Sequence, residues 1–413
     1  SDGREIWATA LPPAPKISGP VDILERPRQL AGPGYPTCCR IGDRIAVGLP
    51  GNVFSVRGKD GELLWNLPAG QPWAHYAAST RVRKEDLVDR AVRGLPLPRA
   101  EHPVRRVRLD DFLGGPLASC RIEAGREVFL LDAFSGRALL RIEGEQTEEL
   151  TGVLAASDLG RLWLALPAAK ELRLYDLKQG RIAARWSLPM SQPLRGLLAP
   201  EPGSAVLADA DTVYTFSLFG NPSVQAIPAP GGVKRLLYAD RQVVVTESMD
   251  GGAQCLPGFE GDLRLHIPSR DGYKPVWAHR DGDILLLLEV DDFQHFVPYG
   301  GRLHFRARRW RLRAVRLPDG QPLWEHAAPA DSQVVVGPPQ VCGDMLLVPW
   351  HRADTAVVTG LDANSGRQPF AVRLSSEGPP EPVSLWASSG QVIVGLADRV
   401  VALAIRQPSE GGR

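Results

Sequence analysis

A short phrase that recurs along the chain constrains its fold more than any other feature. An alternating apolar strand runs into a tight turn that ends in Gly, and a second strand follows. The clearest copies are 361–370 (LDANSGRQPF) and 131–140 (LDAFSGRALL). Turn residues such as Asn364-Ser365-Gly366 supply the positive φ that a tight hairpin needs. The phrase therefore predicts a β-hairpin wherever it occurs.

The spacing of these phrases predicts a ring of repeated units. Their turn glycines stand at positions 3, 61, 136, 180, 220, 261, 320 and 366, and the shorter spacings are 40 to 46 residues. A second hairpin precedes the phrases, as at 42–47 and 343–348, so each unit reads as four short antiparallel strands. Units of about 40 residues with four strands are typical of propeller blades. We therefore predict an all-β fold, an eight-bladed β-propeller, as one domain over residues 1–413.

The two ends of the chain complement each other. The last unit, 382–405, supplies three strands, and residues 3–11 supply a strand that has no blade before it. We expect this N-terminal strand to complete the last blade and close the ring, which removes an open edge. The longer spacings predict insertions at about 71–115 and 269–310. Within the first of them, residues 84–93 have the pattern of a short helix.

Composition and charge exclude several classes of protein. Lys and Arg number 48 against 47 Asp and Glu, so the formal net charge is +1. Such a balance argues against a protein that binds nucleic acid or a membrane surface over its whole extent. The longest apolar runs, 284–288 and 400–405, are too short to span a bilayer. The five Cys predict neither a disulfide framework nor a zinc site.

On these residues the chain resembles the PQQ-like propellers, also called quinoprotein alcohol dehydrogenase-like. Their repeat has Asp four positions before the turn Gly and Trp four positions after it. The matching residues here are Asp132, Asp176 and Asp362 for the Asp, and Trp7, Trp65 and Trp324 for the Trp, with Phe370 and Leu140 as replacements. The resemblance implies a bacterial propeller in which each docking indole is wedged between neighbouring blades. A WD40 ring is disfavoured, because its Gly-His and Trp-Asp pairs are missing.

The resemblance leaves different kinds of function open. Quinone-dependent members hold their cofactor on the propeller axis with a stacking Trp, a Ca²⁺, a base Asp and commonly a vicinal disulfide. Cys38 and Cys39 are adjacent, but the rest of that site is missing, so we interpret them as small residues at the end of an inner strand. We expect no catalytic residue, no cofactor and no metal. Relatives without quinone act as scaffolds, and the chain looks most like the propeller lipoproteins of outer-membrane assembly.

We therefore predict a non-catalytic scaffold or protein–protein interaction module. The alternatives are a quinone- or metal-dependent oxidoreductase, and a glycan-binding, small-ligand-binding or lytic propeller. The resemblance also implies the periplasm or the cell envelope, with the cytoplasm as the alternative. The chain begins with Ser-Asp-Gly, so either a targeting segment has been removed or the chain is a fragment.

Two basic segments are the candidate partner-binding surfaces, because loops on a rigid scaffold tend to carry function. Residues 81–108 contain nine basic residues against four acidic ones, and residues 301–316 contain seven basic and no acidic residues. Such segments predict a surface that faces an anion, either a phosphate, an acidic protein or the backbone of a nucleic acid. Arg binds carboxylates with a planar fork, and we favour a partner protein with an acidic surface. The candidates are Arg81, Arg83, Arg105, Arg106, Arg302, Arg306, Arg308, Arg309, Trp310, Arg311 and Arg313. The alternative is that these charges pair inside the fold, with Asp291, Asp292 or the neighbouring blade.

Overall fold

The computed structural model of the chain describes a molecule built from β-strands. The described residues are 5–10, 37–41, 44–49, 52–68, 104–110, 119–124, 127–132, 138–143, 154–158, 161–166, 170–176, 181–188, 193–218, 223–291, 295–299, 302–327, 334–352, 355–375, 383–388, 391–396 and 399–404. These residues contain no helix, so none that is long and apolar enough to cross a membrane. The segment 84–93, for which a helix is predicted, lies outside them.

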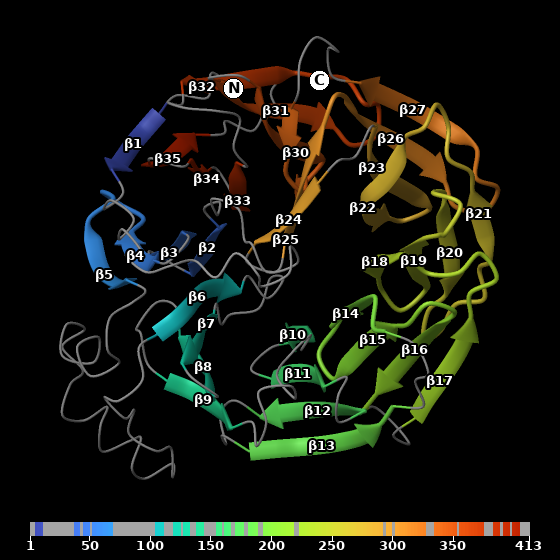
Figure 1. Cartoon of the computed structure of the whole chain (residues 1–413). Helices are drawn as coiled ribbons and strands as arrows, with labels where there is room; N and C mark the ends of the chain where they lie inside the picture. Colours follow the sequence, from blue (N-terminus) through green and yellow to red (C-terminus); the bar gives the residue numbers. More distant parts are fainter. Residues whose placement is uncertain are drawn as a thin grey trace, which may run out of the picture.

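The described strands form eight antiparallel sheets, arranged around a common centre in Figure 1. The first three in chain order are β2 (Thr37–Ile41), β3 (Arg44–Leu49), β4 (Asn52–Arg57) and β5 (Leu63–Pro68); β6 (Val104–Asp110), β7 (Ser119–Ala124), β8 (Glu127–Asp132) and β9 (Ala138–Glu143); and β10 (Leu154–Asp158), β11 (Arg161–Leu166), β12 (Glu171–Asp176) and β13 (Arg181–Ser187). Each of these sheets has four strands in chain order.

Three further sheets continue the ring. They are β14 (Gly196–Leu198), β15 (Ser204–Ala208), β16 (Thr212–Ser217) and β17 (Ser223–Pro228); β18 (Arg235–Ala239), β19 (Val243–Glu247), β20 (Ala253–Pro257) and β21 (Leu265–Ile267); and β22 (Lys274–Asp281), β23 (Ile284–Val290), β26 (Trp310–Arg316) and β27 (Pro322–Ala327). In the last of these sheets, β23 pairs directly with β26, so the chain between them is an insertion.

The next sheet is larger, because this insertion adds to it. Its strands are β24 (His295–Tyr299), β25 (Arg302–Ala307), β28 (Val334–Val336), β29 (Gln340–Cys342), β30 (Met345–Arg352), β31 (Thr355–Asp362) and β32 (Phe370–Ser375). The β24–β25 hairpin pairs through β25 with β28, and Figure 1 shows it near the centre of the ring. The predicted insertion 269–310 is therefore too long: β22 and β23 belong to the preceding sheet, and only the chain after β23 is additional.

The last sheet joins the two ends of the chain. It contains β33 (Ser384–Ser388), β34 (Gln391–Gly395), β35 (Arg399–Ala404) and, on its outer side, β1 (Glu5–Ala10). The pairs include Trp7 with Ala402 and Ala10 with Arg399. The inner strand β2 in turn lies against β33 and β34. The predicted all-β propeller, closed by its N-terminal strand, is thus confirmed.

The apolar core lies between neighbouring sheets. Trp163 and Leu172 of one sheet pack with Leu207 and Phe216 of the next, and all four side chains are buried. Similar clusters join each of the following neighbours up to the sheet of β33 to β35. From the sheet of β10 to β13 onward to the sheet of β33 to β35, neighbouring sheets therefore bury their apolar faces against one another.

The repeated phrase folds as predicted into a tight turn. Gly320 and Gly366 have φ of 70° and 68°, a region that side chains other than Gly rarely adopt. The amide of Gly366 donates to the carbonyl of Asp362 at 2.8 Å, and Gly320 makes the same bond to Arg316. Asp362 Oδ1 also accepts from the amide of Ser365 at 2.8 Å. The hydrogen bonds from Ser365 to the carboxylate lower the pKa of Asp362, so the Asp of the phrase serves as an ionised cap of its turn.

Trp324 lies between its own sheet and the turn of the next one. Its Nε1 donates to the carbonyl of Ala363 at 3.1 Å. The indole packs on Gly366, where any Cβ would lie only 2.5 Å from Trp324 Cε3. In the preceding sheet Leu265, also four residues after a turn Gly, packs on Gly320 in the same way. The contact therefore recurs between two successive pairs of sheets.

For the other predicted docking residues the structure gives fewer side-chain contacts. Phe370 packs across Gly360 of its own sheet and against the cluster shared with the next sheet. Trp7 lies in β1 and Trp65 in β5, and their docking role stays a prediction. Asp132 and Asp176 end β8 and β12, directly before the turns they are predicted to cap.

Replacing Trp324 should weaken the joint between these two sheets. We expect Trp324→Ala to lower the free energy of unfolding by about 3 kcal/mol, since it removes a large, partly buried ring. Trp324→Phe keeps a ring over Gly366 and loses the hydrogen bond to Ala363, so its loss should be about 1 kcal/mol. Denaturant unfolding measures both values. Equal, small losses for the two variants would contradict the packing role of the indole.

Removing the N-terminal strand should open the ring. A chain that lacks residues 1–11 leaves β35 as an unpaired edge and uncovers the faces that β1 covers. We expect a lower thermal midpoint and aggregation in light scattering. A chain that lacks only residues 1–4 keeps β1 and is the matched control. A truncated chain as stable as this control would show that β1 is dispensable for closure.

Candidate functional site: the root of the inserted hairpin

The hairpin insertion leaves and re-enters its sheet through a short, closed root. The amide of Asp291 donates to the carbonyl of Arg309 at 3.2 Å, and the amide of Arg309 donates back to Asp291 Oδ1 at 2.6 Å. Arg309 Nε also binds Asp291 Oδ2 at 2.7 Å. β26 begins at Trp310, directly after this root, and runs from it to the turn at 316–321. The insertion is therefore fixed where it leaves the ring.

Directly beneath this root, one buried carboxylate binds two arginines. Glu289 of β23 accepts from Arg311 Nε and from Arg313 Nη2, each at 2.6 Å. The three residues are 1%, 3% and 2% exposed. The register of the two strands brings them together, since Glu289 stands opposite Arg311 and Arg313 lies two residues further along β26. Both carboxylate oxygens are thus occupied by charged donors inside the sheet.

A loop of the same sheet wraps around Arg311. Arg311 Nη2 donates to the carbonyl of Arg270 at 3.2 Å, and the Arg311 guanidinium lies 4.2 Å from the centre of the Tyr273 ring. The loop reverses through Asp271 and Gly272, whose φ values of 56° and 76° are both positive. Cation–π contact and hydrogen bonding together hold the loop against β26. The root of the insertion is therefore tied to the segment that enters β22.

The charges at this root make a stable cluster only as a set. Burying an ion is costly, and the cost is offset only when partners and hydrogen bonds are in place. Two guanidinium groups share one buried carboxylate, and Asp271 and Glu325 approach Arg311 at 3.6 Å from the exposed side. Within the described residues Arg313 Nε has no hydrogen-bond partner. Glu289 is consequently the residue on which the cluster depends most.

The preceding sheet carries an equivalent carboxylate. Glu247 ends β19, is fully buried, and accepts from Arg235 Nε at 2.6 Å and from Lys234 Nζ at 2.8 Å. Arg235 Nη2 reaches across to the carbonyl of Pro275 in the next sheet at 3.3 Å. A buried glutamate on the second strand thus stiffens two successive sheets at the same end of the ring.

This geometry corrects part of the predicted partner-binding strip. Arg311 and Arg313 are buried and bound to Glu289, so they do not lie on an exposed surface. Trp310 is 1% exposed and packs against Trp350, with ring centres 6.1 Å apart. Arg309 is exposed but paired with Asp291, which is the internal pairing left open as the alternative. Both faces of β26 are buried, so the alternation of Arg with apolar residues along this strand does not mark an exposed face.

The remaining candidates fall on the hairpin itself and on the first insertion. Ala307 is buried in the core cluster, and Arg308 after it is exposed. Arg302 and Arg306 lie in β25, which ends at Ala307. Arg105 and Arg106 lie in β6. Arg81 and Arg83 lie outside the described residues.

The two buried glutamates were not predicted from the sequence, although a signal for them exists. Each is a single acidic residue at or near the end of an otherwise apolar or neutral second strand, in ILLLLEV at 284–290 and VVVTE at 243–247. A charge in such a strand requires a partner of opposite charge. Two arginines at alternate positions of β26 are the partners that this signal would have selected.

Comparisons with known proteins agree on the fold. No protein-family model matches the chain, and no curated protein sequence matches it significantly. Among solved structures it is similar to the computationally designed Ika8 protein, with a TM-score of 0.57 and 13% identity over 91% of this chain and 97% of that one. It is also similar to BamB from Moraxella catarrhalis, with a TM-score of 0.52 and 14% identity over 89% and 96% of the two chains. At this identity the likeness concerns the propeller fold alone.

Neutralising Glu289 should destabilise the fold strongly. Glu289→Gln leaves two buried guanidinium groups without an anion, so we expect the free energy of unfolding to fall by about 3–5 kcal/mol. Asp271→Asn, which removes an exposed carboxylate near the same Arg311, should change it little. Equilibrium denaturation of the two variants gives the comparison. A loss below about 1 kcal/mol for Glu289→Gln would contradict the proposed dependence of the cluster on this carboxylate.

Proposed function

We propose that the protein is a non-catalytic scaffold that binds another protein through the β24–β25 hairpin. The observation that carries the proposal is a regular hairpin added to a propeller sheet and fixed at its root by Asp291 and Arg309. A loop held in this way is pre-organised, so a partner loses little free energy in ordering it. We assign the chain no catalytic residue, cofactor or metal.

The hairpin favours a partner with an acidic surface. Residues 295–308 contain three Arg and two His and no acidic residue. Arg302, His304 and Arg306 stand at alternate positions of β25, and the exposed Arg308 follows the strand. Arginines along one face of a strand match carboxylates on a partner. The near-neutral net charge of the whole chain favours a local contact of this kind over nucleic-acid binding.

We further propose that the chain is a distant member of the PQQ-like propellers and works in the periplasm or cell envelope. The contact of Trp324 with the next sheet supports the membership, because it joins a residue four after one turn Gly to the turn Gly of the following phrase. The likeness to the BamB fold is compatible with it. The compartment rests on the resemblance of the repeat to the outer-membrane assembly propellers.

Charge reversal on the hairpin tests the binding proposal. We expect Arg302→Glu/Arg306→Glu to abolish capture of the partner from a lysate of the source cell, with the thermal midpoint almost unchanged. The matched control is Lys59→Glu/Arg367→Glu, an equal charge change on exposed turn residues. Arg309 is left intact, since a Glu there would face Asp291. Wild-type capture should weaken as salt rises, because salt screens exposed charges.

Two outcomes would contradict the proposal. If both double variants lose the same proteins, the loss reflects net charge and not the hairpin. If the hairpin variant captures the same proteins as the wild-type chain, the binding surface lies elsewhere, and the basic segment 81–108 is the next candidate.

A further inference from the structure

A histidine lies at the joint between two inner strands of the ring. His279 of β22 meets Tyr238 of β18 at a steep angle, with ring centres 5.6 Å apart, and stacks on Trp277 of its own strand at 6.0 Å. β18 and β22 belong to successive sheets, contact each other and lie side by side in Figure 1. Tyr238 also packs against the apolar cluster that the two sheets share. The imidazole is therefore part of the packing that joins these sheets.

The hydrogen bonds around this histidine tie the same two strands together. Asp240, which follows β18, accepts through Oδ2 from the hydroxyl of Tyr238 at 3.1 Å and from Arg280 Nη1 of β22 at 3.2 Å. Its other oxygen, Oδ1, accepts from the amides of Gln242 and Val243 at 2.7 and 2.8 Å. A carboxylate has about four lone-pair sites, so these donors occupy all of them. Asp240 is thus committed to the joint and is not available to bind a further cation.

The neutral form of His279 fits this place better than the charged form. Within the described residues the imidazole makes no hydrogen bond, and burial lowers its pKa below the ordinary value. Asp281 and Asp240 oppose this shift. Asp281 is exposed, however, so that water and salt screen its charge, and the oxygens of Asp240 are occupied. A proton on His279 therefore has no carboxylate to bind.

The other groups that face His279 do not supply an anion. Leu286 stands opposite it on β23, and β19 adds only apolar side chains to the shared cluster. Arg280, the next residue of β22, is itself a cation. Burial raises the pKa of Tyr238, so its hydroxyl stays neutral. No neighbour from β18, β19 or β23 thus offsets the cost of a buried positive charge.

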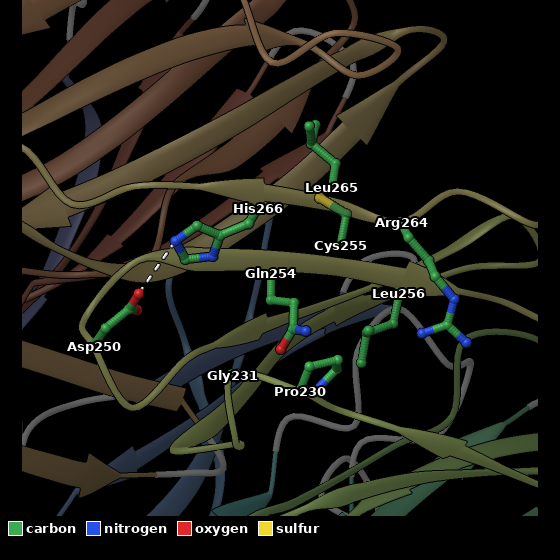
Figure 2. Close-up of a pocket in the computed structure, with 9 residues that line it drawn as sticks. All are labelled: Pro230, Gly231, Asp250, Gln254, Cys255, Leu256, Arg264, Leu265 and His266. Atoms are coloured by element: carbon green, nitrogen blue, oxygen red, sulfur yellow. Dashed lines mark ion pairs between the residues drawn. The ribbon is translucent and has the colours of Figure 1, made fainter.

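His266, in the same sheet as Tyr238, is the opposite case. Its Nε2 lies 3.2 Å from Asp250 Oδ2, and the two side chains are 46% and 61% exposed. Figure 2 shows this ion pair at a pocket of about 460 Å³ on the outer part of the sheet. A charge on His266 is paired and in contact with water, so it does not disturb the packing between sheets. This residue is therefore a matched control for His279.

We propose that protonation of His279 loosens the joint between the sheet of β18 to β21 and the sheet of β22 to β27, and so makes the ring sensitive to mild acid. A charged imidazole has to regain the water that the rings of Tyr238 and Trp277 exclude. Its movement toward solvent separates these rings, and the hydrogen bonds of Asp240 across the joint weaken with them.

The direction of the effect with pH follows from the two states of the chain. The unfolded chain binds this proton more tightly than the folded chain, because burial disfavours the charged imidazole only in the fold. Stability is therefore constant above about pH 7 and falls as the pH drops below about 6.5, the ordinary pKa of imidazole. The root of the hairpin lies at the other end of β22, where Lys274 pairs with Val290, so this device is separate from the proposed binding surface.

Titration of the full chain tests the proposal. NMR of Cε1-labelled histidine follows each imidazole, and the signal that His279→Gln removes is that of His279. We expect this signal to titrate with a midpoint below about pH 6.5. Between pH 7.5 and 5.5 the thermal midpoint of the wild-type chain should fall by about 2 °C or more beyond that of His279→Gln. His266→Gln, the same change at the exposed and paired position, should fall as the wild type does.

Hydrogen exchange locates the effect. After correction for the intrinsic rates, the amides of β18 and β22 should lose protection at pH 5.5 in the wild-type chain and keep it in His279→Gln, while those of β15 and β16 keep it in both. If His279→Gln does not fold, His279→Phe takes its place, because it keeps a ring between Tyr238 and Trp277. A titration midpoint of His279 at or above pH 6.5, equal falls in thermal midpoint for the wild type and the His279 variant, or unchanged protection of β18 and β22 would each overturn the proposal.

Discussion

Burial of apolar sheet faces against neighbouring sheets is the interaction on which the rest of the structure depends. A sheet of four short strands cannot bury both faces by itself, so each needs a neighbour on either side. The clusters that contain Phe216, Leu285 and Val348 each take residues from two sheets. A series of sheets satisfies this requirement only when it closes. The pairing of β1 with β35 supplies the closing joint without a covalent bond.

Within this apolar frame, two buried glutamates occupy the same end of two successive sheets. Glu247 and Glu289 each bind two basic side chains, and Arg235 and Arg311 extend these contacts to the backbone of a neighbouring strand or loop. A cluster of this kind contributes less to net stability than to a fixed geometry, because desolvation offsets much of its attraction. Fixed geometry is what an inserted hairpin needs at its root. The two clusters thus link packing in the ring to the surface that the hairpin presents.

The repeat made most of the fold predictable from sequence, and long-range pairing made the site unpredictable. Each turn is encoded locally, by an Asp and a Gly within five residues, so the hairpins, their order and the role of the N-terminal strand follow from the pattern. The position of Arg311 depends on Glu289, which lies 22 residues earlier and meets it only through strand register. Alternating arginines have the same sequence pattern on exposed and buried strands. For the same reason, no local signal indicates that the hairpin between β23 and β26 joins the next sheet by pairing β25 with β28.

Pro298 in β24 has a consequence for solubility. Within the described residues β24 is the last strand of its sheet and pairs only with β25, in a register that sets Pro298 opposite Leu303. Proline is tolerated in a paired strand only where its nitrogen faces away from the partner. The outer side of β24 therefore lacks one backbone donor, and another strand cannot continue a regular ladder along it. A sheet extended toward the centre of the ring is in this way protected from edge-to-edge polymerisation.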